Sequence, residues 1–414
     1  MKIGILSDTH FGFAQGTERE NDALFQSQQA LEAILKEKVD FVLLAGDLFD
    51  SNQPSPEAWK QSFSFFKLAQ PIPNSLALER ENRSGEKQKI EWNCLPIVSI
   101  HGTHEYRPKD FVNALEVLEK SGFLVHLHAQ KLFLRKGKEI VVVHGLSGVP
   151  EKVALNALKQ WNPRPEKNCH NIFVLHQSIT DFLPTKDEMA ATISLSDFPR
   201  GFDLLVNGHL HWPKVHETPG GKFLLTGSTI CTQIKKLEAE HPKGYWIYNT
   251  ISKKLDFREI LRQRKMFYKK MVFENATRES VQEKINLFFE GIFKQSFELK
   301  PLVRVKLGGT LQRGLEPKAL NLAGLLAPWK EKCLLSFEEN FASASLQQKI
   351  AELRKLQKSK TSITSHGMAL LEKELEKTAF NKAFDVHLIF EWLEYGEIDK
   401  VIEALTQSKK ESNP

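Results

Sequence analysis

The stretch "VDFVLLAGD" at residues 39–47 is a run of apolar residues that ends in a glycine and an aspartate. An apolar, β-branched run of this length is typical of a strand buried on both faces of a sheet. Amphipathic segments at 22–38 and 109–121 separate the early runs, so the sequence predicts an α/β fold in which helices cover a layered sheet. Similar runs recur through the first 250 residues: "KIGILSD" (2–8), "LPIVSIHG" (95–102), "EIVVVHG" (139–145), "NIFVLHQ" (171–177), "FDLLVNGHLH" (202–211), "KFLLTGS" (222–228) and "GYWIYN" (244–249).

The composition is that of a globular protein, with 41% hydrophobic and 26% charged residues among 414. This length suggests about two or three domains. The N-terminal "MKIGILSDTH" lacks the apolar core of a secretory signal, and no stretch reaches the roughly 18 apolar residues of a membrane span, so we expect a cytoplasmic protein. Four cysteines lie far apart without a C-x-x-C pair, which argues against a disulfide framework or a zinc ribbon. The formal charge of +6 fits a polyanionic partner or simply a solvated surface.

The composition and the periodicity of the sequence change along the chain. Residues 74–93 carry mixed charges without a period, which we interpret as a surface insertion. From 251 to 340, a helix-like segment and the alternating "PLVRVKLGG" predict a small α+β domain. The polar, Lys-rich segment 341–366 reads as a linker. Apolar content returns in 367–414, where we expect a helical segment.

Two apolar stripes at helical spacing predict a pair of short helices in that last segment, joined at Gly396. Because a polar linker isolates the first stripe, we expect it to form a partner-binding groove rather than part of a core. The first stripe consists of Phe384, Leu388, Ile389, Trp392 and Leu393. The second consists of Ile398, Val401, Ile402 and Leu405.

Side chains that can bind metal follow five of the predicted strands. They are Asp8, His10, Asp47, His104, His176, His209 and His211. A single histidine at a strand end is more often a hydrogen-bonded structural residue, but ligands bind at the carboxyl ends of strands, and the whole set falls on one sheet edge. A carboxylate can bridge two cations while imidazoles complete their shells, which suits Mn²⁺, Fe or Zn²⁺. Such a pair of cations promotes phosphoester hydrolysis.

The motifs "DTH", "GDLFD", "GTHE", "LHQ" and "GHLH", in this order, resemble the five signatures of the calcineurin-like metallophosphoesterases. That resemblance implies a layered β-sandwich flanked by helices. "AGDLFDSNQPSPEAW" and "KGYWIYN" further resemble the SbcD-like nuclease subunits of DNA double-strand-break repair, which pair with a coiled-coil ABC ATPase. The resemblance covers residues 1–250 as a nuclease domain. More faintly, it implies a DNA-capping domain over 251–340 and an ATPase-binding segment in 367–414.

The resemblance also implies two divalent metal ions, with Mn²⁺ as the expected metal. One ion would be held by Asp8, His10, Asp47 and His211. The other would be held by Asp47, His176, His209 and the residue at position 103. His104 would act as the transition-state or leaving-group histidine.

Two positions depart from the family pattern inside this site. The family has Gly-Asn-His-Asp, with the asparagine as a metal ligand, where this chain has Gly102, Thr103, His104 and Glu105. Many relatives also place a histidine after "GDLF", where this chain has Asp50. Both departures concern residues of the predicted site, so they bear on the activity rather than on the fold.

The leading hypothesis is therefore a Mn²⁺-dependent DNA exonuclease and endonuclease that acts as a homodimer with an ABC ATPase. A catalytically weakened scaffold subunit and a small-molecule metallophosphodiesterase remain open, although the long region beyond residue 250 argues against the latter. "RQRKMFYKK" (262–270) interleaves bases with aromatics, which fits either DNA contact or a solvated helix edge. No G-x-x-x-x-G-K-[ST] motif occurs, so any ATP-driven step must come from a partner.

Overall fold

A computed structural model describes residues 1–108, 111–183, 193–342, 385–394 and 397–407, together with Met368 and Glu372. The chain divides into two compact units. The first contains Met1–Lys269, Lys294–Val305 and Pro328–Phe337. The second contains Lys270–Phe293, Lys306–Ala327 and Glu338–Pro414.

The first unit contains two large mixed sheets. The six-stranded sheet is formed, in spatial order, by β14 (Lys254–Glu259), β13 (Gly244–Asn249), β1 (Lys2–Leu6), β2 (Phe41–Ala45), β5 (Ile97–Ile100) and β6 (Val125–His126). The eight-stranded sheet is formed by β11 (Lys214–Thr218), β12 (Gly221–Leu225), β10 (Leu204–Asn207), β9 (His170–Leu175), β8 (Glu139–Leu146), β7 (Gln130–Lys136), β3 (Ala77–Glu81) and β4 (Lys87–Ile90). Strands β1, β2 and β5 run parallel in the first sheet, as do β8, β9, β10 and β12 in the second.

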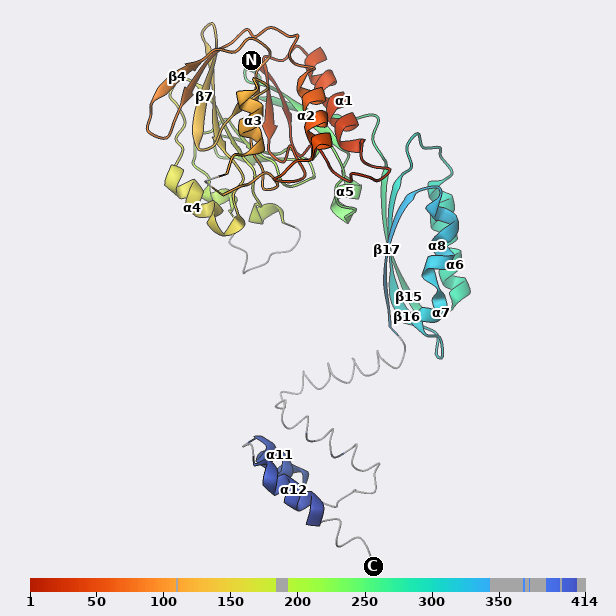
Figure 1. Ribbon diagram of the computed structural model, residues 1–414. Coiled ribbons are helices and arrows are strands. Elements are labelled where there is room, and N and C mark those ends of the chain that lie inside the picture. Colours follow the sequence, from red (N-terminus) through yellow and green to blue (C-terminus); the bar gives the residue numbers. More distant parts are fainter. Residues whose placement is uncertain are drawn as a thin grey trace, which may run out of the picture. The chain divides into compact units, whose positions relative to one another are not determined.

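Alternation along each strand produces the layers, because successive side chains point to opposite faces. In β2, Phe41 and Leu43 enter the core between the two sheets, whereas Val42 and Leu44 pack beneath helices. Those helices are α1 (Asp22–Lys36), α2 (Pro56–Phe66) and α3 (Ala114–Lys120), drawn in red to orange in Figure 1. Helix α4 (Glu151–Trp161) packs on the outer face of the eight-stranded sheet through Ala154 and Leu158. The structure confirms the predicted layered α/β sandwich.

The segment 74–93, which we interpreted as a surface insertion, has regular structure. It forms the hairpin of β3 and β4; β3 pairs with β7, and β4 is the edge strand of the sheet. The Asn82 side chain accepts hydrogen bonds from the backbone at the turn, and Gly85 adopts a φ of 80°. Charged side chains occupy most positions of the two strands, and Leu78 is the only strand residue buried in the core, so the sequence shows no apolar period here.

The six-stranded sheet extends past residue 250, since β14 pairs with β13. Beyond it, a three-stranded sheet has the order β15 (Met266–Ala276), β16 (Leu302–Leu311) and β17 (Leu334–Ala342). The helices that accompany it are α6 (Arg278–Ile292), α7 (Pro317–Leu320) and α8 (Leu322–Lys330). Figure 1 shows α6 and α8 along one side of these strands. The first unit also contains α5 (Lys236–Glu240) and two 3₁₀ turns, η1 (Thr180–Phe182) and η2 (Leu195–Asp197).

The basic stretch 262–270 is not a helix edge, because β15 begins within it at Met266. Arg264 is buried and forms an ion pair with Asp22 at 2.8 Å. Arg262 pairs with Glu298, and Lys265 pairs with Glu259 at 3.1 Å. The first bases of the stretch therefore form intramolecular ion pairs. Lys269 and Lys270 on β15 are exposed and form no ion pair with the described residues.

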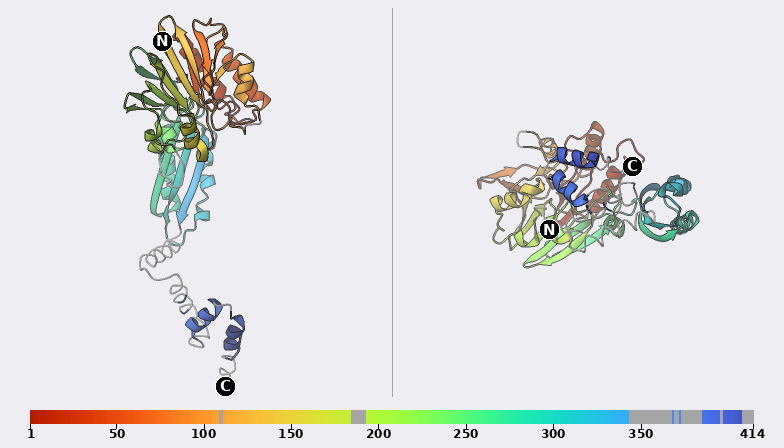
Figure 2. Two further views of the ribbon diagram at one scale, coloured as in Figure 1. Left: turned by 90° about the vertical axis from the view of Figure 1, so that its left-hand side faces the viewer. Right: turned by 90° about the horizontal axis from the view of Figure 1, so that it is seen from below.

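Near the C-terminus, α11 (Val386–Glu394) and α12 (Ile398–Gln407) contact each other, as Figure 2 shows for the blue helices. In the first stripe, Ile389 is buried whereas Leu388 and Leu393 are 43% and 53% exposed. Trp392 is half-buried, and Phe384 lies outside the described residues. Within the described part of the chain, no helix is both long and apolar enough to cross a membrane.

Candidate metal centre

The predicted ligands follow strands whose carboxyl ends meet at one edge of the sandwich. Asp8 and His10 come after β1, and Asp47 comes after β2. From the other sheet, His176 follows β9 directly. Because β1, β2 and β5 are parallel, as are β9 and β10, the loops after them converge. The remaining predicted site residues lie in the loops after β5 and β10: Thr103, His104, His209 and His211.

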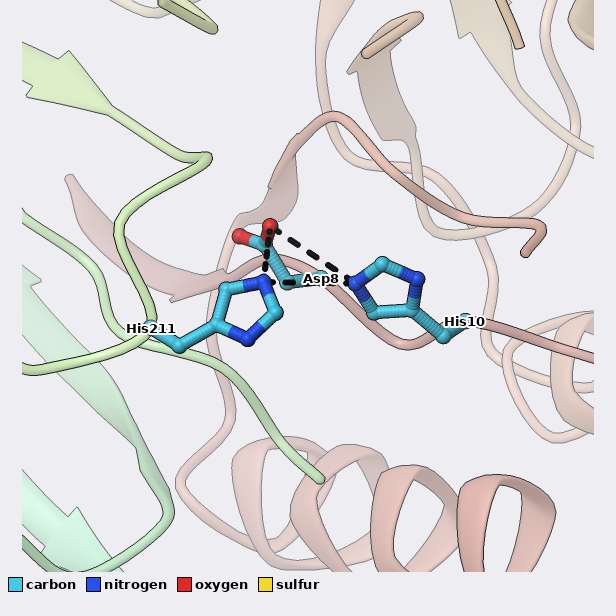
Figure 3. A group of neighbouring side chains, drawn as sticks. All are labelled: Asp8, His10 and His211. Carbon is cyan, nitrogen blue, oxygen red and sulfur yellow. Dashed lines mark hydrogen bonds and ion pairs between the residues drawn. The ribbon is translucent and has the colours of Figure 1, made fainter. Parts of the chain in front are cut away.

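The first cluster consists of Asp8, His10 and His211, whose ligand atoms lie within 4.8 Å of one another (Figure 3). Asp8 Oδ1 lies 3.3 Å from His211 Nε2 and 4.0 Å from His10 Nε2. The two Nε2 atoms are 3.4 Å apart. Two imidazole nitrogens and a carboxylate oxygen thus face a common point, as metal ligands do.

The second cluster consists of Asp47, His176 and His209. His176 Nε2 lies 3.0 Å from Asp47 Oδ2 and 4.0 Å from Asp8 Oδ1, so Asp8 lies between the two clusters. Thr103 belongs to this side of the centre, since its Oγ1 is 3.4 Å from His209 Nδ1. The structure therefore brings together all seven residues that the sequence predicted as metal ligands.

The backbone is unusual at the ligands. Asp8, His10, Asp47 and His209 have φ values of 53°, 49°, 47° and 71°. This left-handed region is uncommon for residues with a side chain, and such conformations gather at functional sites. Close approach also requires glycine, because a Cβ at Gly102 would lie 2.1 Å from Asp47 Oδ1.

Buried charge dominates the electrostatics. Burial by itself would raise the pKa of Asp8 and of Asp47, but nearby imidazoles, His176 foremost, hold both carboxyl pKa values below the usual range. Burial opposes a charged His176, yet Asp47 and Asp8 raise its pKa to about 10. For His211, contacts with Asp8 and Glu238 outweigh burial and raise the pKa to about 9. The carboxylates of Asp8, Asp47 and Glu238 thus favour positive charge on these two histidines.

His176 provides a direct test of whether a cation fits. Its Nδ1 lies 2.6 Å from the backbone oxygen of Ala45, which only accepts hydrogen bonds, so Nδ1 carries a proton. Its Nε2 is fully buried, faces Asp47 Oδ2 and has no partner in hydrogen-bond geometry. Positive charge between His176 Nε2 and Asp47 Oδ2, from a proton or a metal ion, is needed to satisfy both atoms. The donor set therefore fits a divalent cation.

In three of the predicted ligand histidines, the ring nitrogen that faces away from the cluster contacts a polar side chain, as is usual for metal-binding histidines. His10 Nδ1 lies 3.1 Å from Asp50 Oδ1. His211 Nδ1 lies 3.0 Å from Thr232 Oγ1 and 3.5 Å from Glu238 Oε1. His209 Nε2 contacts Ser178 Oγ at 3.1 Å and approaches Glu151 Oε1 at 3.9 Å. Sequence reasoning missed Ser178, Glu151, Thr232 and Glu238, because they occupy no recognisable spacing relative to the ligands.

The turn that contains Thr103 is held by Glu105. This buried carboxyl accepts hydrogen bonds from the backbone N–H groups of Phe49 and Gly102, each at 2.6 Å. Burial and the charge of Asp47 raise the pKa of Glu105 to about 8. Glu105 thus ties the loop after β5 to the loop after β2.

His104 lies at the opening of the centre. Its backbone N–H donates to Asp47 Oδ1 at 2.9 Å, and its ring Nδ1 lies 2.9 Å from the backbone oxygen of Asp50. The His104 side chain is 45% exposed and lines a cleft of about 740 Å³. Trp212, Lys235 and Lys236 line the same cleft. A substrate in this cleft could reach both clusters and His104.

Residues 1–213, more than half of the chain, match the family model described as calcineurin-like phosphoesterase. The chain belongs to this family. Metallophosphoesterases use divalent metals, and the two clusters described above could hold such ions.

Among curated proteins, the chain is similar to the double-strand break repair protein mre-11 of Caenorhabditis elegans, at 28% identity over 60% of this chain and 39% of that protein. It is 26% identical to human MRE11 over 58% of this chain and 38% of the relative. It is 30% identical to Mre11 of Sulfolobus acidocaldarius over 58% of this chain and 57% of the relative. The chain thus spans between about two fifths and three fifths of the length of these relatives.

Among solved structures, a putative 5'-nucleotidase from Staphylococcus aureus aligns at 15% identity and a TM-score of 0.37, over 62% of this chain and 52% of that chain. An archaeal phosphodiesterase aligns at 14% identity and a TM-score of 0.31, over 62% of this chain and 99% of that chain.

Proposed function

We propose that this protein is a two-metal phosphodiesterase that cleaves DNA. The observation that carries the proposal is the pair of aspartate and histidine clusters, with Asp8 Oδ1 lying 4.0 Å from both His10 and His176 Nε2 atoms. The clusters open into a cleft bordered by Lys235 and Lys236, cations suited to a phosphate-bearing substrate.

We assign the two metal ions to the ligand sets implied by the resemblance, with Mn²⁺ as the proposed metal. Asp8, His10, Asp47 and His211 would hold one ion. Asp47, His176, His209 and Thr103 would hold the other. When bound, such ions activate a water molecule and neutralise charge on the phosphate oxygens.

His104 is the proposed proton-transfer group. The backbone oxygen of Asp50 only accepts hydrogen bonds, so His104 Nδ1 carries the proton of that contact. The proton on Nε2 is then the one that His104 can exchange with a leaving oxygen. Its exposure in the cleft allows contact with substrate.

A role in double-strand-break repair is supported by the names of the relatives, which are repair proteins. We propose that the exposed apolar residues Leu388 and Leu393 on α11 help to bind a coiled-coil ABC ATPase. A homodimer, the DNA-capping role of residues 251–340 and the cytoplasmic location remain predictions from the sequence.

A weakened scaffold subunit is the second candidate, and Thr103 is the observation that favours it. The Thr103 hydroxyl contacts His209 Nδ1, the nitrogen on the metal side of that ring, where the family has an amide ligand. A weaker second metal site would lower activity and leave the fold intact.

The decisive experiment combines the purified protein and Mn²⁺ with end-labelled linear duplex DNA and, separately, with bis(p-nitrophenyl) phosphate. We expect cleavage of both substrates. Cleavage of the small diester alone would favour a small-molecule phosphodiesterase. Absence of both activities at every Mn²⁺ concentration would favour the scaffold.

Asp47→Ala is the matched variant for this assay. Because Asp47 belongs to both proposed ligand sets, its loss should abolish hydrolysis. DNA affinity, measured by fluorescence anisotropy, should stay within a few-fold because phosphate contacts elsewhere provide binding. Undiminished cleavage by this variant would refute the two-metal assignment.

A further inference from the structure

Asp50 contacts two functional histidines at once. Its Oδ1 lies 3.1 Å from His10 Nδ1, and its backbone oxygen lies 2.9 Å from His104 Nδ1. Its own backbone N–H donates to the Phe11 oxygen at 3.0 Å, which anchors the residue. The His10 side chain is 1% exposed and that of Asp50 is 33% exposed, so the contact reaches from the cleft into the buried centre.

These contacts determine which nitrogen of each ring carries a proton. An ionised carboxylate and a backbone carbonyl only accept hydrogen bonds, so Nδ1 of His10 and Nδ1 of His104 are the donors. The lone pair of His10 is then on Nε2, the atom that faces Asp8 and His211. Asp50 therefore prepares His10 for metal binding through the atom that the first cluster requires.

The two rings also support each other. Their centroids are 4.9 Å apart and their planes meet at 85°, an edge-to-face contact. Rotation of the His10 ring would therefore disturb His104. The side chain of Asp50 orients His10, while its backbone carbonyl is the closer contact of His104, at 2.9 Å from Nδ1 compared with 3.9 Å for Asp50 Oδ1.

We propose that Asp50 is a positioning residue, whose carboxylate holds His10 in its metal-binding orientation and whose carbonyl holds His104 at the cleft. This inference rests on the metal centre of the proposed function and extends it to a residue that departs from the family pattern.

The side chains of His10, Asp50 and His104 are close enough to suggest a third cation site, since their ligand atoms lie within 4.8 Å of one another. The hydrogen bonds argue against it. Both Nδ1 atoms donate protons toward Asp50, so neither presents a lone pair there. The number of bound cations distinguishes the two roles.

The test is a Mn²⁺ binding isotherm by titration calorimetry on the full chain and its variants. Asp50→Ala should still bind the same number of Mn²⁺ ions, with one of them weakened about 10–100-fold. Asp50→Asn should lose less affinity, because an amide oxygen can accept the hydrogen bond from His10 Nδ1. Asp256→Ala is the matched control: its side chain is also 33% exposed and its ion pair with Lys254 at 2.8 Å lies outside the centre, so its isotherm should match the wild type.

Loss of one bound Mn²⁺ in Asp50→Ala, with unchanged affinity for the rest, would make Asp50 a metal ligand and overturn the proposal. An unchanged isotherm would overturn it as well.

Cleavage of the small diester gives a second readout: at saturating Mn²⁺, Asp50→Ala should regain most of the wild-type kcat, since the carbonyl still holds His104. A kcat that stays low would instead indicate a direct role in chemistry. If the wild type binds Mn²⁺ but cleaves nothing, the proposed function fails while the isotherms still decide the role of Asp50.

Discussion

At the scale of single residues, the threonine at position 103 is the most informative substitution in the centre. Its Oγ1 lies 3.4 Å from His209 Nδ1, while Ser178 contacts the opposite nitrogen of the same ring. The hydroxyl is therefore close to the second cluster, but it is shorter than an asparagine amide and a weaker neutral donor to a hard cation. We propose that the second metal ion binds weakly and last.

Thr103→Asn should lower the Mn²⁺ concentration required for half-maximal cleavage by about 10–100-fold, because the amide oxygen adds a stronger ligand. Thr103→Val keeps the shape without the hydroxyl and should raise that concentration. Initial rates of diester hydrolysis across a Mn²⁺ series measure both effects. Identical titrations of all three proteins would remove Thr103 from the ligand set.

At the scale of elements, buried ion pairs connect segments that are far apart in the chain. Arg264, which precedes β15, contacts Asp22 at the start of α1, with both side chains less than 10% exposed. The same guanidinium donates to the backbone oxygens of Lys300 at 3.0 Å and Glu18 at 2.9 Å. One side chain thus satisfies a buried carboxylate and two carbonyl groups.

Arg264→Ala should lower the free energy of unfolding by up to about 3 kcal/mol, because buried Asp22 would keep only Arg19 as a counterion and the backbone oxygens of Lys300 and Glu18 would lose their donor. Arg262→Ala is the matched control. Its ion pair with Glu298 is 49% and 61% exposed, so its loss should cost at most about 1 kcal/mol. Urea-induced unfolding followed by fluorescence gives both values. A similar cost for the two variants would contradict a structural role for Arg264.

At the scale of the whole molecule, the described residues of α11 and α12 contribute no side chain to the proposed metal centre. Truncation at about residue 366 should leave the protein folded and catalytically active, because the metal centre lies entirely within the first 250 residues. Binding to the ABC ATPase should be lost with α11 and its exposed apolar residues. Calorimetric melting and co-purification with the ATPase test the two halves of this prediction. A large fall in melting temperature would assign these helices to the core.

The stability of the whole molecule should also depend on pH through buried neutral histidines. Burial lowers the pKa of His126 to about 3 and that of His144 to about 4, compared with about 6.5 in an unfolded chain. As pH falls below about 6.5, the unfolded state binds protons that the folded state excludes. Stability is therefore full above pH 6.5 and is lost progressively down to the folded pKa values.

Each such histidine should contribute a slope of up to about 1.4 kcal/mol per pH unit. Urea unfolding at pH 7 and pH 5 in the presence of a chelator measures the loss. His144→Gln should reduce the loss, whereas the exposed His216→Gln should leave it unchanged. Equal stability of the wild type at both pH values would show that these histidines are not held neutral in the fold.

The amino-acid sequence was sufficient to predict the central strands of both sheets, the helix-covered α/β layers and the ligand-bearing strand ends, while the family resemblance implied the layered sandwich. Apolar runs such as residues 39–47 report burial locally, and parallel strands bring their carboxyl ends to one edge. Only the tertiary structure revealed the partners of those ligands. Glu238 and Ser178 support histidines that are distant in sequence, so no local pattern could identify them, and the contact of Asp50 with His10 likewise appears only in the fold. The hairpin at 74–93 and the buried Arg264 could not be predicted for the same reason. Their charged residues take structural roles through neighbours, β7 and Asp22, that only the fold brings close.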